Sequence, residues 1–247
     1  MHQTVRKILN FFYPNRCPKC GVFLSAEETL CEPCAEEILL EQDGYCHICG
    51  KSNCMCKYKP PVYDRAVIAC RYDHLTAPAV YQLKESKNTN FAYFAARILA
   101  ERLRHGSYYE AEKFDYIMPV PMHKSKQRRR GYNQAGLIAK ELSSILHLPC
   151  RDDVLYKEKS GIEQHKLHSA IEREQNTKNF GIHDISLENC RILLCDDVLT
   201  TGSTMNRCAE LLKQNHAVFV TAAAAASTAP RDKEQKKETE INPSGGN

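Results

Sequence analysis

From residue 62 to residue 229, short apolar runs alternate with longer segments in which apolar residues recur every three or four positions. A short apolar run predicts a buried strand, and the longer spacing predicts a helix with one apolar face. Strands are expected at 62–73, 114–121, 180–185 and 191–195. Helices are expected at 77–104, 133–146 and 205–213, and the alanine-rich 218–223 fits a strand or a helix. This alternation favours an α/β fold, with a mostly parallel sheet that is covered by helices on both faces.

Two other parts of the chain lack this alternation. Residues 1–60 are rich in cysteine, and Pro60 and Pro61 then interrupt helix and strand alike. Residues 231–247 carry four basic and four acidic side chains and almost nothing apolar, which is typical of disorder. We therefore expect a small domain at 1–60, a larger domain at 61–230 and a disordered tail at 231–247. Within the larger domain, residues 157–178 fit neither period and predict a long functional loop.

The composition excludes some classes of protein. With 43% hydrophobic and 26% charged residues, the chain has the composition of a soluble globular protein. No apolar run approaches the roughly 20 residues that span a bilayer, and the N-terminal residues lack the long apolar core and cleavage site of a signal peptide. We therefore expect a cytoplasmic protein without a membrane span. A net charge of +4 is too small to indicate a nucleic-acid partner by itself.

Eight cysteines between residues 17 and 56 form four close pairs, in CPKC, CEPC, CHIC and CMC. In a chain without an export signal, such pairs favour metal binding over disulfides. A Cys-x-x-Cys turn directs two thiolates to one side, which suits two corners of a zinc tetrahedron. We predict two structural zinc sites, one formed by Cys17, Cys20, Cys31 and Cys34, the other by Cys46, Cys49, Cys54 and Cys56. CMC is an unusual half-site, and His47 is an alternative ligand there.

The stretch ILLCDDVLTTGST, from Ile192 to Thr204, combines an apolar run, two carboxylates and a turn of small residues. In an open parallel sheet, ligands bind beyond the carboxyl ends of the strands, where Asp196 and Asp197 are expected. Carboxylates accept hydrogen bonds from sugar hydroxyls and hold Mg²⁺, while a small-residue turn before a helix offers N–H groups to a phosphate. The stretch therefore predicts a ribose site beside a phosphate site. The simpler alternative is an acidic strand end followed by a helix that a threonine caps.

The chain contains neither G-x-G-x-x-G nor G-x-x-x-x-G-K-[ST], which argues against dinucleotide and P-loop sites. Instead, ILLCDDVLTTGST resembles the 5-phosphoribosyl 1-pyrophosphate (PRPP) signature of type I phosphoribosyltransferases. Together with the paired cysteines, PVPMHKSKQRRRGYNQA and the later QHKL segment, it makes residues 15–228 resemble the competence protein F (ComF/GntX-like) family. Cys195 stands where that family usually has an aliphatic residue.

The resemblance implies a role for each part of the site. Asp196 and Asp197 would bind the ribose hydroxyls and are the candidate catalytic residues. The 5′-phosphate would be held by Thr200, Thr201, Gly202, Ser203 and Thr204. The pyrophosphate loop would comprise Val120, Pro121, Met122 and His123, followed by the basic Lys124. Residues 157–178 would form the flexible lid, with Gln164 and Arg173 as candidate contacts, and Lys84 lies where the family tends to have lysine.

Several functions stay open at this stage. The run KSKQRRR at 124–130 holds five cations and no acid, and it fits a solvated loop, the pyrophosphate end of the PRPP site, or a contact to a nucleic-acid backbone. The whole chain fits a phosphoribosyltransferase that uses Mg²⁺ and PRPP. It also fits a non-catalytic protein that binds PRPP and single-stranded DNA and works with DNA-uptake proteins. A third reading is a zinc-ribbon adaptor that docks protein partners. The sequence does not identify an acceptor for the ribose.

Overall fold

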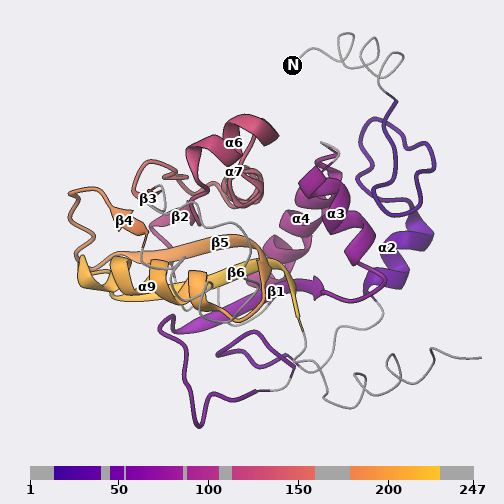
Figure 1. Cartoon of the computed structure of the whole chain (residues 1–247). Helices are drawn as coiled ribbons and strands as arrows, with labels where there is room; N and C mark the ends of the chain where they lie inside the picture. Colours follow the sequence, from indigo (N-terminus) through magenta and orange to yellow (C-terminus); the bar gives the residue numbers. More distant parts are fainter. Residues whose placement is uncertain are drawn as a thin grey trace, which may run out of the picture.

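The computed structural model describes residues 14–39, 45–52, 54–85, 88–105, 113–158 and 179–228. Its centre is a parallel sheet of four strands in the order β1-β6-β5-β2 (Figure 1). These strands are β1 (Arg65–Arg71), β2 (Tyr116–Pro119), β5 (Arg191–Leu199) and β6 (Phe219–Ser227). A short antiparallel pair, β3 (Leu155–Lys157) and β4 (Phe180–Ile182), forms a second sheet. The prediction of an α/β fold with a mostly parallel sheet is confirmed.

Helices cover both faces of the main sheet. The helices of the described residues are α2 (Glu32–Leu39), α3 (Ala77–Glu85), α4 (Asn90–His105), α6 (Lys124–Arg130), α7 (Gln134–Leu146) and α9 (Ser203–Gln214), of which α6 has no buried residue. Leu193 and Cys195 of β5 belong to the core cluster that includes α4 and α7, whereas Ile192 and Leu194 belong to the cluster that includes α9. Successive side chains of a strand point to opposite faces. The apolar run of β5 therefore fills both cores, and Figure 1 shows the helices on either side of it.

The alanine-rich segment, which fitted a strand or a helix, is the inner strand β6. Every residue from 220 to 227 is buried, and β6 pairs with β1 along one edge and with β5 along the other. Alanine favours helix in isolation. Here the hydrogen bonds along both edges and the packing on both faces decide the conformation, because strand preference depends strongly on such context.

The predicted helix at 77–104 is wrong in one respect, because it is two helices. Helix α3 ends at Glu85 and α4 begins at Asn90. At the junction, Nδ2 of Asn88 and Nδ2 of Asn90 both donate to the carbonyl of Arg16, at 3.0 and 3.1 Å. These asparagines therefore fasten the helical layer to the cysteine-rich segment, which a periodicity along one stretch of chain does not reveal.

Two predicted strands have different bounds. The strand expected at 180–185 is the shorter β4, which pairs with β3 and not with the main sheet. The strand expected at 191–195 continues to Leu199, because its pairing with β6 extends to the register partner Ser227. Asp196 and Asp197 therefore lie inside the last part of β5 rather than beyond its end.

The cysteine-rich segment packs on the α/β layers at two places. Cys17, Leu30, Cys34 and Ile38 are buried in the core cluster on the α4 side of the sheet. The turn at Cys46–Gly50 lies instead against β1, where the amide of Ala66 donates to the carbonyl of His47 at 2.8 Å. The tail predicted at 231–247 lies outside the described residues. Among the residues that the structure describes, no helix is long and apolar enough to cross a membrane.

Candidate functional site

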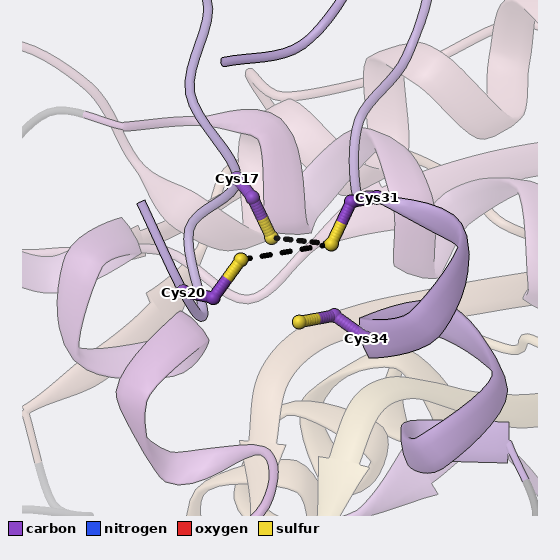
Figure 2. Close-up of side chains that lie close together, drawn as sticks. All are labelled: Cys17, Cys20, Cys31 and Cys34. Atoms are coloured by element: carbon purple, nitrogen blue, oxygen red, sulfur yellow. Dashed lines mark hydrogen bonds between the residues drawn. The ribbon is translucent and has the colours of Figure 1, made fainter. Parts of the chain in front are cut away.

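The first cysteine cluster has the geometry of a metal site. The Sγ atoms of Cys17, Cys20, Cys31 and Cys34 lie within 4.8 Å of one another and converge on one point (Figure 2). Cys31 Sγ is 3.6 Å from Cys20 Sγ and 3.7 Å from Cys17 Sγ. Zinc bonds of about 2.3 Å in a tetrahedron place the sulfurs roughly 3.8 Å apart, so the residues fit a structural zinc ion. Burial acts against ionisation of Cys17, but the backbone N–H groups of Cys20 and Cys31 lower its pKa to about 7, which favours the thiolate that zinc requires.

The second cluster gathers Cys46, Cys49, Cys54 and Cys56, again with all Sγ atoms within 4.8 Å of one another. Sγ of Cys46 and Sγ of Cys56 are 3.9 Å apart. The unusual Cys-x-Cys half-site therefore supplies its two sulfurs, and His47 is not a member of the cluster that the described residues form. Burial opposes ionisation of Cys46 too, yet the backbone N–H of Cys49 and nearby donors lower its pKa to about 7. All four ligands come from the protein in each cluster, which is typical of structural zinc.

A cavity of about 370 Å³ opens where strands β2 and β5 end. It is lined by Tyr72, Lys84, Val120, Pro121, Met122, His123, Lys126, Asn133, Gln134, Ala135, Lys157, Phe180, Asp196, Asp197, Val198, Thr200 and Thr204. Most of the side chains expected in a ribose and phosphate site therefore share one space, although they come from separate parts of the chain.

The two aspartates differ in their surroundings. Oδ2 of Asp197 lies 3.0 Å from Nζ of Lys84, which α3 carries. The carboxylate of Asp196 accepts a hydrogen bond at 2.8 Å from the amide of Asp197. Burial, and next the charge of Asp197, raise the pKa of Asp196 well above its usual range. An acid whose ionised form is poorly solvated gains from any ligand that brings hydroxyl donors or a cation.

The turn after β5 has the shape expected of a phosphate loop. Gly202 is buried and has a φ of 80°, a conformation that costs other residues energy. Thr201 Oγ1 lies 2.9 Å from Ser203 Oγ and accepts from the Ser203 amide at 3.3 Å, so the turn is braced before α9 begins at Ser203. Thr200 and Thr204 line the cavity, while Thr201, Gly202 and Ser203 form the turn without lining it.

Three lysines line the cavity, Lys84, Lys126 and Lys157. Lys84 was expected from the family resemblance. Lys126 belongs to the run KSKQRRR, for which the pyrophosphate end was one of three readings, and Lys157 is the first residue of the predicted lid. Burial, and next the charge of Arg130, lower the pKa of Lys126. Burial, and next the charge of Lys126, lower the pKa of Lys157. These cations are partly desolvated and repel one another. A bound polyvalent anion would stabilise their charged forms.

The RGYNQ stretch, at 130–134, makes structural contacts that the sequence analysis did not predict. Tyr132 Oη and Gln134 Nε2 donate to the carbonyl of Leu83 at 2.8 and 3.3 Å. Asn133 Nδ2 donates to the carbonyl of Val120 at 2.9 Å. These bonds fasten the residue before Lys84 and the start of the expected pyrophosphate loop to the N-terminus of α7.

The remaining predicted residues are distributed as follows. Val120, Pro121 and His123 line the cavity, and Nδ1 of His123 also accepts from the Ser125 amide at 3.2 Å at the start of α6. Lys124 lines a neighbouring cavity of about 450 Å³ instead. Gln164 and Arg173, expected in the lid, lie outside the described residues, as does most of the lid itself.

Comparisons with known proteins identify two domain families along the chain. The double zinc ribbon domain family matches residues 8–70, and the phosphoribosyl transferase domain family matches residues 92–244. DNA utilization protein YhgH of Escherichia coli (strain K12) is 30% identical over 206 residues, which cover 83% of this chain and 86% of that protein. Competence protein F of Haemophilus influenzae is 32% identical over 219 residues, which cover 84% and 94%. Among solved structures, a purine phosphoribosyltransferase from Pyrococcus horikoshii Ot3 is 26% identical, covers 56% of this chain and 73% of that one, and has a TM-score of 0.36.

Proposed function

Because the chain belongs to the competence protein F family, in which a double zinc ribbon precedes a phosphoribosyl transferase domain, we propose that it binds PRPP together with Mg²⁺. The observation that carries the proposal is the shared cavity, which is lined by two adjacent carboxylates, by three lysines, and by Thr200 and Thr204 at the two ends of the small-residue turn. A sugar that carries a phosphate at one end and a pyrophosphate at the other offers hydroxyl donors to the carboxylates and negative charge to the lysines.

Each group has a task in this arrangement. Asp196 and Asp197 accept hydrogen bonds from the ribose hydroxyls, and the turn from Thr200 to Thr204 holds the 5′-phosphate. Lys126 and Lys157 face the pyrophosphate end. Carboxylate oxygens are the donors that Mg²⁺ prefers, so the aspartates fit this ion, which when bound neutralises part of the pyrophosphate charge.

The proposal extends to chemistry at ribose C1. In a transfer, the bond from C1 to the pyrophosphate oxygen breaks, its electron pair leaves with pyrophosphate, and an acceptor forms the new bond. Lys126 and Lys157 stabilise the charge that develops on the leaving group, because preorganised cations act most strongly in a partly dry site. Release of pyrophosphate on addition of an acceptor distinguishes a transferase from a protein that only binds PRPP.

The names of the relatives support a role in handling DNA. Helix α6 presents the exposed side chains of Lys124, Lys126, Arg128 and Arg129, and Arg130 pairs with Glu85 at 3.3 Å. We propose that this helix contacts the phosphate backbone of single-stranded DNA. Such binding weakens steeply with salt, and Arg128→Glu/Arg129→Glu is expected to abolish it without changing PRPP binding, since neither residue lines the 370 Å³ cavity.

Thermal unfolding with and without Mg-PRPP tests the central proposal. At a ligand concentration of about 100 Kd, binding to the native state raises Tm by roughly 5–10 °C for a domain of this size. The double variant Asp196→Asn/Asp197→Asn is expected to lose this shift. Asp184→Asn, which changes an exposed carboxylate outside the cavity, serves as the matched control and retains it. No shift in the unmodified protein, or an equal shift in the double variant, would refute the assignment.

A further inference from the structure

The second cysteine cluster touches the turn that we assign to the 5′-phosphate. Nζ of Lys51 donates a hydrogen bond at 3.0 Å to the backbone carbonyl of Thr201. Lys51 follows Cys49 by two positions, and Thr201 is an exposed residue of the turn. A side chain of the zinc ribbon thus holds the backbone of a loop that lies 150 residues further along the chain.

The position of Lys51 is set by the metal-binding turn. The amide of Gly50 donates to the carbonyl of Cys46 at 2.8 Å, and the amide of Cys46 donates to the carbonyl of Lys51 at 3.0 Å. Both bonds close the turn that presents Cys46 and Cys49 to the metal. Loss of the ion frees these cysteines, and with them the segment that directs Lys51 at Thr201.

The same turn packs directly on the sheet beside the site. A Cβ added at Gly50 would lie 2.9 Å from Ala66 Cβ and 3.0 Å from Leu199 Cδ2. Leu199 is the last residue of β5, immediately before the phosphate turn. No space separates the ribbon from the strand that carries the aspartates and leads into the turn.

A buried tyrosine makes a second connection. Tyr63 is 2% exposed, and its hydroxyl donates to the carbonyl of Cys49 at 3.0 Å. The same hydroxyl lies 3.7 Å from the position that a Cβ would take on Gly202. Tyr63 therefore fills the space between a zinc ligand and the glycine at which the phosphate turn adopts its positive φ.

The first ribbon has no comparable contact among the described residues. Its cysteines pack on the α4 side of the sheet, and Lys19, between Cys17 and Cys20, pairs with Glu37 of its own ribbon. The two zinc sites therefore differ in what they support, although their ligand sets are alike.

We propose that Lys51 is a positioning residue for the 5′-phosphate turn, and that the second zinc site regulates PRPP affinity by holding Lys51 in place. This inference rests on the proposed function, because it concerns the same site. It assigns to the second ribbon a task beyond its own folding: the ribbon pre-orders the turn before the ligand arrives, which lowers the entropy that binding must remove.

The test compares Lys51→Ala, Lys51→Arg and the matched control Lys19→Ala by calorimetric titration with Mg-PRPP, with the zinc content of each protein measured. Lys51→Ala is expected to weaken binding about 2- to 10-fold, as for loss of one charge-assisted hydrogen bond at a partly exposed position. Lys51→Arg restores binding because it keeps the donor, and Lys19→Ala binds as the unmodified protein does. All three retain their zinc.

Hydrogen exchange separates positioning from direct contact with the ligand. In ligand-free Lys51→Ala, the amides at 202–204 are expected to exchange faster than in the unmodified protein. Cys54→Ser, which removes an exposed ligand of the second site, has the same effect, whereas Cys20→Ser in the first site does not. Unchanged exchange and unchanged affinity in Lys51→Ala, while the unmodified protein binds PRPP, would overturn the inference. Absence of binding in the unmodified protein would instead refute the proposed function.

Discussion

The ammonium group of Lys84 lies 3.0 Å from the carboxylate of Asp197, and both side chains are only partly exposed. This pair joins α3 to β5 at the mouth of the cavity. Lys84 also lowers the pKa of Asp196, although burial and the Asp197 charge outweigh it. Lys84 therefore pairs directly with Asp197, while its charge only partly offsets the effects that raise the pKa of Asp196.

Replacement of this lysine is expected to destabilise the protein in a pH-dependent way. In Lys84→Met, Asp197 loses its ion-pair partner, and loss of a partly exposed pair of this kind costs about 1 kcal/mol. The loss in Tm is larger at pH 8 than at pH 5, because protonation of Asp196 at the lower pH removes the charge that repels Asp197. Unfolding curves across this range measure the effect, and Lys140→Met, which breaks the exposed pair with Asp152, shows how little a surface pair contributes.

Asp196→Asn is expected to stabilise the ligand-free protein while it weakens binding. The pKa of Asp196 is raised in the folded state, so the native protein holds a proton more tightly than the unfolded chain does. The contribution of this group is therefore fully favourable below the unfolded pKa and is lost as pH rises through the folded pKa. At pH 8 the uncharged amide of the variant avoids the free-energy cost of holding an ionised carboxylate in a buried position.

The gain from Asp196→Asn is about 1 kcal/mol, which raises Tm by roughly 2–4 °C. Paired unfolding curves with and without Mg-PRPP provide both readouts. A variant that is less stable than the unmodified protein at pH 8 would show that Asp196 is well solvated after all, whatever its effect on the ligand.

Two parts of the site, the aspartates with their turn and the cysteine clusters, could be predicted from short stretches of sequence. ILLCDDVLTTGST encodes strand, acids, turn and helix within one contiguous stretch, and the cysteine pairs lie close in sequence. Both features depend on short-range geometry, which periodicity and spacing capture. The end of α3 at Glu85 and the start of α4 at Asn90 were not predicted. Asn88, just before α4, is bonded to Arg16, which lies far away along the chain.

The charges around the cavity depend on the folded chain instead. Lys84, Lys126 and Lys157 stand on three different elements, and only the packing of these elements brings them to one space. A lysine in a basic run is most often solvated, so the run KSKQRRR did not indicate that Lys126 lines this cavity while Lys124 lines another. The contact of Lys51 could not be predicted from the sequence either, because its partner is a backbone carbonyl, which any residue offers.

Binding of PRPP is expected to take up protons at alkaline pH. The pKa values of Lys126 and Lys157 are lowered in the free protein, by burial first and by neighbouring cations next. A bound pyrophosphate group raises both values toward their usual range, so near pH 9 the complex holds more protons than the free protein. Titration calorimetry in two buffers of different ionisation enthalpy measures this uptake. Lys126→Gln/Lys157→Gln removes it and weakens binding, whereas Lys124→Gln does neither.

Substitution of Gly50 tests how closely the second ribbon fits the sheet. At a φ of 69°, an alanine meets Ala66, Ile68 and Leu199 at 2.9–3.0 Å, and the left-handed conformation adds about 1–2 kcal/mol. Gly50→Ala is therefore expected to lower Tm by several degrees and to loosen the second zinc site, so that a chelator removes one zinc per chain faster than from the unmodified protein. Gly21→Ala in the first ribbon has a similar φ of 78° but meets nothing within 4 Å. Gly21→Ala therefore carries only the cost of the backbone conformation. The difference in Tm between the two variants measures the effect of the contact with β1 and β5.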